Sequence, residues 1–250
     1  MKVQSRKSML ELIRDNIVKY GHHIYLIPGG MLPRYAYTIG LREAIGAELI
    51  LAGASFYSAE DVKRIINEVA AKLRTGVDWW KSALEVSSLG LFSPRKVDSS
   101  WAEALMLGAL DFYSVRKLEA FQIVPDQNHS SIDVPNFAEP WSATAEPVWQ
   151  WLHEPWRYVV PPESVAITNL DALRGGRITE AARWEEDQWE LFSGAGPDVP
   201  RENIRVVPLG TLLAVDESLS AITNLKVGRA LWRDSTELEW HLWKECGKGR

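Results

Sequence analysis

Residues 141–162, a stretch rich in tryptophan and proline, constrain the fold of this chain more than any other feature. Clustered prolines mark turns and linkers, and this stretch separates two parts of different texture. With 250 residues, the chain is long enough for one large or two small domains. We therefore predict an N-terminal domain over residues 1–157 and a C-terminal domain over residues 158–250.

In the first part, apolar spacing predicts helices and strands. The clearest helix spans residues 58–76, because Ser58 is a suitable N-cap, apolar residues recur at i, i+3, i+4 and i+7, and Gly76 ends the pattern. A capping box at Ser100 and Glu103 predicts a second helix over 100–110. A further helix is expected over 8–19, strands over 22–27, 35–41, 48–53 and 119–124, an extended segment over 79–92 and a polar loop over 125–140.

The second part consists of shorter elements. Strands are expected over 164–167, 178–184, 188–192, 204–207, 229–232 and 239–244, and short helices over 208–215 and 217–222. No internal repeat relates the two parts. We predict an α+β fold in two small domains, each a mostly antiparallel sheet with a few packed helices.

Composition excludes several classes of protein. Basic and acidic residues number 28 and 33, and the net charge of −5 gives no footprint for direct nucleic-acid binding. A single cysteine, Cys246, excludes a disulfide framework and a cysteine-rich zinc site. No run approaches the ~18 uncharged apolar residues that cross a membrane, and charges at Glu11, Arg14 and Asp15 interrupt the segment after the basic start. We expect a cytoplasmic protein with no membrane association.

Two motifs resemble chemical sites but are better explained as structure. His22 and His23 are adjacent, and neighbouring residues of a strand face opposite sides of a sheet, so they cannot bind one metal ion together. Tyr113 and Lys117 have the spacing of a catalytic pair in short-chain dehydrogenases, but that chemistry needs a glycine-rich nucleotide loop between a strand and a helix. No such loop stands in the sequence. We therefore predict no catalytic residue, no metal and no cofactor.

The polar loop after residue 124 supports an alternative. Asp126 and His129 follow a strand end, where catalytic groups are often placed, and they could be grouped with Ser130. The protein would then be an enzyme or a small-ligand sensor of unknown substrate, with Tyr37, Gly40, Asp126 and His129 as ligand residues. Polar loops carry such residues routinely, so a binding role for the protein is preferred.

Tryptophan is the most informative residue type. None of the 12 tryptophans precedes Trp79, four crowd between residues 141 and 156, and five lie between 184 and 243. Such residues pack a core, form a protein-binding surface, or provide a platform on which a sugar or base stacks. Packing within and between domains is the simplest role, and a protein-binding surface is the next.

The sequence resembles a family of bacterial proteins, the domain-of-unknown-function family DUF4262. The resemblance is carried by an Ala-Tyr-Thr-x-Gly-Leu signature at residues 36–41, by residues 47–50, by a helix with Asn67 and Gly76, and by residues 121–126. A second resemblance covers the C-terminal part. Residues 187–194, 207–213 and 228–233 are similar to an appended module that looks like small immunity proteins found beside secreted bacterial toxins.

These resemblances imply a bacterial α+β protein from a toxin–immunity neighbourhood. They favour a non-catalytic binding protein of immunity or antitoxin type, which neutralises a secreted or interbacterial toxin by covering its site. Net acidity would steer such a protein toward a basic partner. Trp189 and Trp232 fall in the module-like segments, which favours a place in the core. The expected contact surface consists of Trp149, Trp151, Trp156, Trp184, Glu185, Glu186, Asp187 and Trp189.

Overall fold

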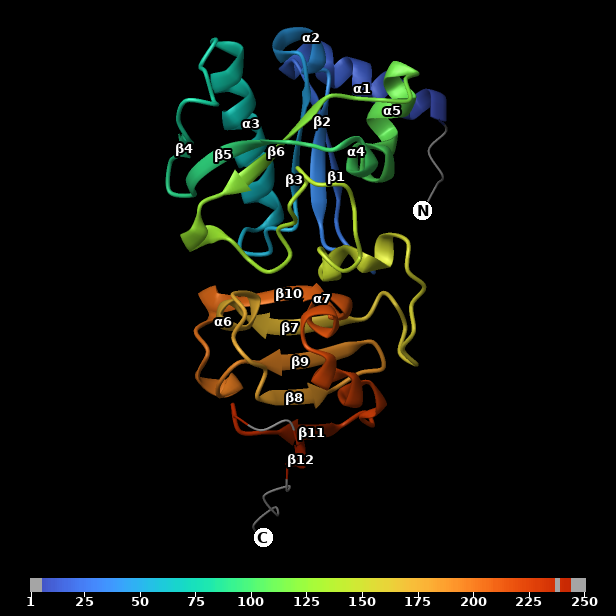
Figure 1. Ribbon diagram of the computed structural model, residues 1–250, viewed down its shortest axis with the longest axis vertical. Coiled ribbons are helices and arrows are strands. Elements are labelled where there is room, and N and C mark those ends of the chain that lie inside the picture. The colour runs from blue at the N-terminus through green and yellow to red at the C-terminus, as the bar shows by residue number, and fades with distance from the viewer. Residues whose placement is uncertain (1–5, 237–238, 244–250) are drawn as a thin grey trace. The chain divides into compact units, whose positions relative to one another are not determined.

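The computed structural model describes residues 6–236 and 239–243, and the chain divides into two compact units (Figure 1). The first unit comprises Met1–Pro28, Arg34–Ser130 and Val134–Glu146, and the second comprises Gly29–Pro33, Ser131–Asp133 and Pro147–Arg250. Each unit holds one six-stranded sheet and several helices, so the predicted α+β class in two sheet-bearing parts is confirmed. From residue 147 onward the chain belongs to the second unit, whereas the sequence predicted a boundary after residue 157.

The sheet of the first unit has the strand order β1-β2-β3-β6-β5-β4. Its strands are β1 (His23–Ile27), β2 (Tyr35–Ile39), β3 (Glu48–Ala52), β4 (Leu84–Val86), β5 (Gly90–Lys96) and β6 (Ala120–Pro125). Its helices are α1 (Arg6–Tyr20), α2 (Arg42–Ile45), α3 (Ala59–Arg74), α4 (Ser99–Leu105), α5 (Leu107–Tyr113) and the 3₁₀ turn η1 (Gln127–His129). β3 and β6 run parallel, and the other described neighbours run antiparallel.

Helix α3 forms where its periodicity predicted it. The side chain of Ser58 accepts the backbone N–H of Asp61 and so caps the helix. Its apolar stripe, which includes Val62, Ile65 and Val69, is buried in a core shared with β2 and β3. Each Å² of apolar area removed from water contributes about 25 cal/mol, so this burial stabilises the first unit.

The helix predicted over 100–110 is wrong as a single element. The chain breaks at Met106 and forms α4 and α5 on either side of it. Asp98, and not Ser100, is the N-cap of α4, because its carboxylate accepts the backbone N–H of Ser100 at 2.9 Å.

The sheet of the second unit has the strand order β10-β7-β9-β8-β11-β12. Its strands are β7 (Val165–Asn169), β8 (Glu180–Arg183), β9 (Gln188–Phe192), β10 (Ile204–Pro208), β11 (Arg229–Trp232) and β12 (His241–Leu242). Its helical elements are η2 (Pro147–Leu152), α6 (Leu170–Leu173), η3 (Gly196–Asp198), η4 (Arg201–Asn203), α7 (Leu209–Val215) and η5 (Glu217–Asn224). Here β7 and β9 are the parallel pair. The strand predicted over 239–244 shortens to β12, and residue 244 lies outside the described residues.

Helix α7 covers one face of the second sheet (Figure 1). It packs on β7 and β10 and contacts both η2 and η5. Gly210 in α7 permits the approach of two indoles, because a Cβ at this position would lie 2.8 Å from Nε1 of Trp151 and 3.2 Å from the ring of Trp156. From residue 147 onward the tryptophan-rich stretch therefore packs as part of the second unit and does not serve as a free linker.

Candidate functional site

The tryptophans predicted as a contact surface prove to be of two kinds. Trp149, Trp151 and Trp189 are 0%, 2% and 0% exposed. The indole N–H of Trp149 donates to the carbonyl of Asp133 at 2.9 Å, and the Arg183 guanidinium lies 4.5 Å from the ring centre of Trp189. The rings of these three tryptophans fill the core of the second unit, and the fold as described leaves them no surface for a partner.

The remaining tryptophans of the second part are more accessible. Trp184 is 51% exposed, whereas Trp156 is half-buried, edge-on to Trp151 and bonded to the carbonyl of Val160. Trp232 was expected in the core but is 44% exposed. The reason is strand alternation, since Trp232 points to the side of the sheet opposite the one that α7 covers.

On the side of this sheet opposite α7, paired side chains form a continuous row across five strands. Ile167 pairs with Val206 and Glu190, Glu190 pairs with Ala182, and Ala182 pairs with Ala230. Paired residues share a face of a sheet, so these five side chains point to the same side. Val206 is 65% exposed. We call this surface the open face.

A groove of about 450 Å³ is hollowed into the open face. Its floor includes Ala182 and Ala230, whose small side chains leave the space unfilled. Trp184 and Trp243, each about half exposed, line it. A second depression, lined by Trp243 and Trp232, adjoins it. Aromatic rings therefore border the groove.

The groove is acidic. Its described lining residues include Glu180 and Glu190 but no Lys or Arg. One carboxylate oxygen of Glu180 accepts the backbone N–H of Gly196 at 2.8 Å, which fixes this side chain. The predicted acidic run, residues 185–187, follows Trp184 in the exposed turn between β8 and β9. The surface around Trp184 thus combines apolar area with negative charge.

The signature segment of the first unit, residues 36–41, donates hydrogen bonds to a buried carboxylate. Glu48 on β3 is 0% exposed. It accepts hydrogen bonds from the Thr38 hydroxyl at 2.6 Å, the Gly40 N–H at 2.9 Å, the Arg42 N–H at 3.1 Å and the Tyr113 hydroxyl at 2.5 Å. A buried carboxylate is tolerated only when its lone pairs are satisfied in this way. Gly40, proposed as a ligand residue in the alternative, is thereby engaged in the fold.

The two tyrosines singled out from the sequence are also structural. Burial and the neighbouring Glu48 carboxylate raise the pKa of the Tyr113 phenol, whereas a catalytic tyrosine–lysine pair requires a lowered pKa. Tyr37 is 2% exposed and its hydroxyl accepts the backbone N–H of Gly108 at 3.0 Å. Among the described residues, the polar and ring contacts of Tyr37 and Gly40 do not include Asp126 or His129, so the grouping of these four residues stays a prediction.

Asp126 and His129 do form a pair. Nδ1 of His129 lies 2.8 Å from Oδ1 of Asp126, and Oδ2 of Asp126 accepts the backbone N–H of Leu91 at 2.8 Å. Burial acts to raise the pKa of Asp126, but these hydrogen bonds outweigh it and the pKa lies below the usual range. The anionic Asp126 therefore orients Nδ1–H of His129 toward itself. Among the described residues, Nε2 of His129 has no hydrogen-bond partner.

Gly90 and two aromatic rings build the surroundings of this pair. Gly90 has a φ of +107°, and a Cβ there would lie 2.7 Å from both Oδ2 of Asp126 and Nδ1 of His129. The ring of Phe56 stands edge-on to the His129 imidazole, and Tyr57 stacks parallel to it. The imidazole is thus fixed in orientation while its side chain stays 28% exposed.

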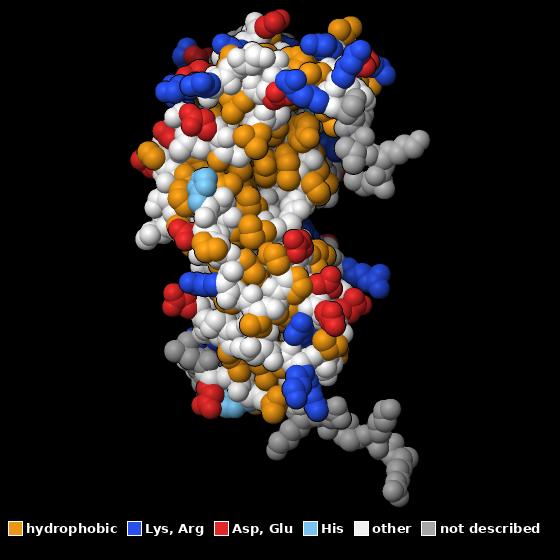
Figure 2. All heavy atoms as spheres, turned by 90° about the vertical axis from the view of Figure 1, so that its right-hand side faces the viewer, with side chains coloured by type: hydrophobic (Ala, Val, Ile, Leu, Met, Phe, Trp, Pro, Cys, Tyr) orange, Lys and Arg blue, Asp and Glu red, His pale blue; other side chains and the backbone are white. Residues whose placement is uncertain are grey.

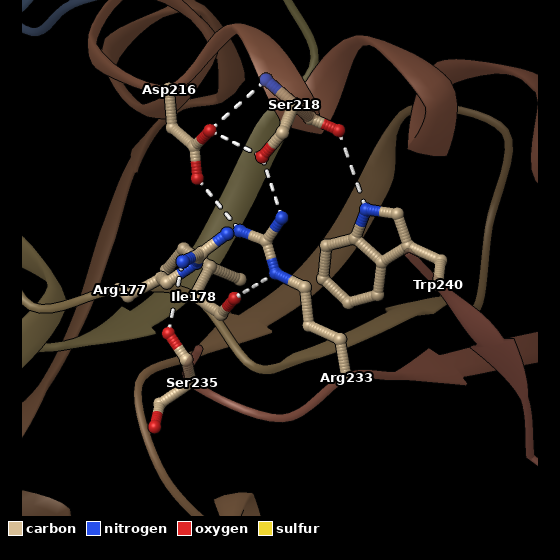
Figure 3. A network of polar contacts seen from close by, with 7 residues as sticks. All are labelled: Arg177, Ile178, Asp216, Ser218, Arg233, Ser235 and Trp240. Carbon is tan, nitrogen blue, oxygen red and sulfur yellow. Dashed lines mark hydrogen bonds and ion pairs between the residues drawn. The ribbon is translucent and has the colours of Figure 1, made fainter. Parts of the chain in front are cut away.

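A buried arginine that sequence reasoning missed organises the C-terminal end of the second unit (Figure 3). The side chain of Arg233 is 0% exposed and donates to Asp216 at 2.7 Å, to the Ser218 hydroxyl at 2.5 Å and to the Ile178 carbonyl at 2.7 Å. Its guanidinium lies 4.3 Å from the ring centre of Trp240. Apolar periodicity cannot find such a residue, and the one available signal is its place at the end of the module-like segment 228–233.

Two classes of site are not found in the described part of the chain. No group of three or more His, Cys, Asp or Glu in residues 6–236 and 239–243 could hold a metal ion, and Cys246 lies outside them. No helix within these ranges is long and apolar enough to cross a membrane. On the face drawn in Figure 2, basic and acidic side chains are interspersed, so the described residues visible there form no continuous basic stripe.

Comparison with known proteins gives one finding. Residues 16–131 match a family described as a domain of unknown function, DUF4262. The first unit is therefore similar to this family, and the matched span contains both the Glu48 network and the Asp126–His129 pair. The second sheet lies outside the matched span, and its likeness to immunity proteins stays a prediction. No curated protein and no solved structure matches the chain.

Proposed function

We propose that this protein is a non-catalytic binding protein of the immunity type, which neutralises a bacterial toxin by covering a basic surface of that toxin with the open face of its second sheet. One observation carries the proposal. Trp184 and Trp243 border an apolar groove whose charged lining residues, Glu180 and Glu190, are both acidic.

The geometry suits a protein partner. The groove, at about 450 Å³, accepts one or two partner side chains, and Val206 and Trp232 extend the apolar surface beyond it. Half-exposed tryptophans beside a groove are the residues that carry binding energy in protein interfaces, where one of them contributes about 2 kcal/mol or more. The sheet beneath them is packed on its other side by α7.

The charge of the surface favours a basic partner. Glu190 lies on the open face, and residues 185–187 add acidic groups in the adjoining turn. Lysine or arginine side chains can bind between carboxylates and aromatic faces at once. Because such attraction is screened by salt, the association rate should fall as ionic strength rises.

The test is a binding measurement by calorimetry between the purified full chain and the toxin candidates encoded beside its gene. Replacing Trp184 by Ala should weaken binding about 30-fold, which corresponds to about 2 kcal/mol, and Glu190→Lys should weaken it further and reduce its salt dependence. Trp80→Ala is the matched control, since Trp80 is 59% exposed but lies in the first unit, edge-on to Phe121. Absence of binding by every neighbour, or equal losses in Trp184→Ala and Trp80→Ala, would overturn the proposal.

A second candidate function rests on the Asp126–His129 pair. An oriented, partly exposed imidazole whose Nε2 has no hydrogen-bond partner among the described residues offers that nitrogen to a ligand, as an enzyme or small-ligand sensor requires. A thermal-shift panel of metabolites and nucleotides tests it. A true ligand at about 100 times its dissociation constant adds about 2.7 kcal/mol of stability, and His129→Gln should remove that gain. A panel without any stabilisation would eliminate this candidate.

A further inference from the structure

A polar pocket of about 470 Å³ lies in the first unit between α1, the start of β1 and α3. His22, only 5% exposed, lies at its inner side, and Arg74 and Asn67 stand exposed at its rim. The other described lining residues are Asn16, Tyr20, His23, Ile24 and Ala71. None of these lining residues is acidic.

The two arginines of α3 differ in their partners. Arg64 forms an ion pair with Glu68, one turn along the helix, at 2.9 Å. Arg74 makes no ion pair within the described part of the chain. It donates instead to two uncharged acceptors, the carbonyl of Tyr20 at 3.3 Å and Nδ1 of His22 at 3.0 Å. A guanidinium has five N–H donors, so three remain for a ligand.

The fold holds this guanidinium in place. Gly21 has a φ of +79°, and a Cβ there would lie 2.6 Å from Nη2 of Arg74. The positive φ favours glycine at this position, and a larger side chain there would displace the end of Arg74. A guanidinium fixed by two acceptors loses little rotamer freedom when it binds a ligand, which favours binding.

Both histidines of the pocket are uncharged at neutral pH, so Arg74 is the one positive charge among the described lining residues. Because a guanidinium only donates, Nδ1 of His22 must accept, and the imidazole is neutral. Burial, together with the charge of Arg74, lowers the pKa of His22 to about 4. Burial also lowers the pKa of His23, whose Nδ1 lies 2.9 Å from the amide nitrogen of Asn16. The pocket at neutral pH thus combines one cation with uncharged donors and acceptors.

We propose that this pocket binds a small molecule through an oxyanion, a phosphate or a carboxylate, held by the guanidinium of Arg74. Arginine is suited to such groups because its planar fork donates two parallel hydrogen bonds to two oxygens. The pocket volume exceeds that of the oxyanion alone, so the remainder of the ligand would lie against Ile24 and Ala71. This binding site lies in the first unit and is independent of the protein-binding function proposed for the second.

The experiment is an NMR titration of the intact protein that follows the imidazole signals of His22 and His23. Inorganic phosphate and acetate are added in separate arms, with sodium chloride at equal ionic strength as the reference. Saturable shifts with phosphate, acetate or both are expected, and the arm that saturates identifies the oxyanion. Arg74→Gln should weaken the binding at least tenfold, whereas Arg64→Gln on the same helix should leave it unchanged.

A second variant protects the test against loss of folding. Arg74→Lys keeps the charge but lacks the planar fork, so it should retain binding at lower affinity. Shifts that match those of sodium chloride, that never saturate, or that persist unchanged in Arg74→Gln would overturn the proposal.

Discussion

Removal of the buried guanidinium of Arg233 should lower the free energy of unfolding of the second unit. Arg233→Met keeps the apolar stem but removes the guanidinium that donates to the carbonyl of Ile178 and to Oδ2 of Asp216. Breaking a buried ion pair from one side costs about 3–5 kcal/mol. The side chain of Asp216 is 27% exposed and can be hydrated after the change, which places the cost near 3 kcal/mol, the lower end of that range.

The opposite change should cost more. Asp216→Ala leaves the charge of Arg233 at 0% exposure without its carboxylate. It also removes the N-cap of η5, because the Asp216 side chain accepts the backbone N–H of Ser218, and a lost cap adds about 1 kcal/mol. A total of about 5 kcal/mol follows. The structure thus predicts an asymmetry between two variants that break the same contact.

Urea unfolding followed by tryptophan fluorescence measures both costs, since most tryptophans lie in the second unit. Arg177→Met is the matched control, because the partly buried Arg177 donates to the carbonyl of Ser235 and to no other described residue (Figure 3), and its cost should stay within about 0.5 kcal/mol. A loss below about 1 kcal/mol in Arg233→Met, or a smaller loss in Asp216→Ala than in Arg233→Met, would refute the reasoning.

Three further outcomes follow from the structure. Trp189→Ala should cost about 3–5 kcal/mol of unfolding free energy in the same urea assay, because the ring is fully buried. Gly90→Ala should separate Asp126 from His129, since the added Cβ collides with both, and the His129 imidazole signals in an NMR spectrum should move accordingly. The neutral His22, with its pKa lowered to about 4, should make stability fall as pH drops from about 6.5 toward 4, because the unfolded chain binds a proton there first. His22→Gln should flatten the pH dependence of the urea midpoint over that window, and an unchanged profile would contradict the assignment.

Local sequence patterns predicted those elements whose signals are local. Helix α3 carries its cap at Ser58 and its apolar rhythm within a short stretch, and it forms as expected. The alternation at Trp232 correctly indicates a strand, but which side of that strand is covered depends on where α7 packs, and α7 lies elsewhere in the sequence. The core placement expected for Trp232 failed for this reason.

Long-range polar contacts could not be predicted from the sequence. Glu48 reads as one charged residue at the start of an apolar strand, yet its burial depends on Tyr113, 65 positions away. Arg233 likewise depends on Ile178, 55 positions away. Neither spacing nor composition encodes which donor meets which acceptor across a sheet, so the partners of these two buried charged groups became visible only in the folded chain.

The most direct test of the open face as the binding surface is ¹⁹F NMR of the protein labelled with 5-fluorotryptophan, with and without a toxin candidate that binds. The resonances of Trp184, Trp232 and Trp243 should shift or broaden on binding, because these rings border the groove or the depression beside it, whereas those of Trp149 and Trp189 should stay in place. Changes confined to Trp79 and Trp80 of the first unit, or unchanged signals from the three open-face rings, would contradict the account.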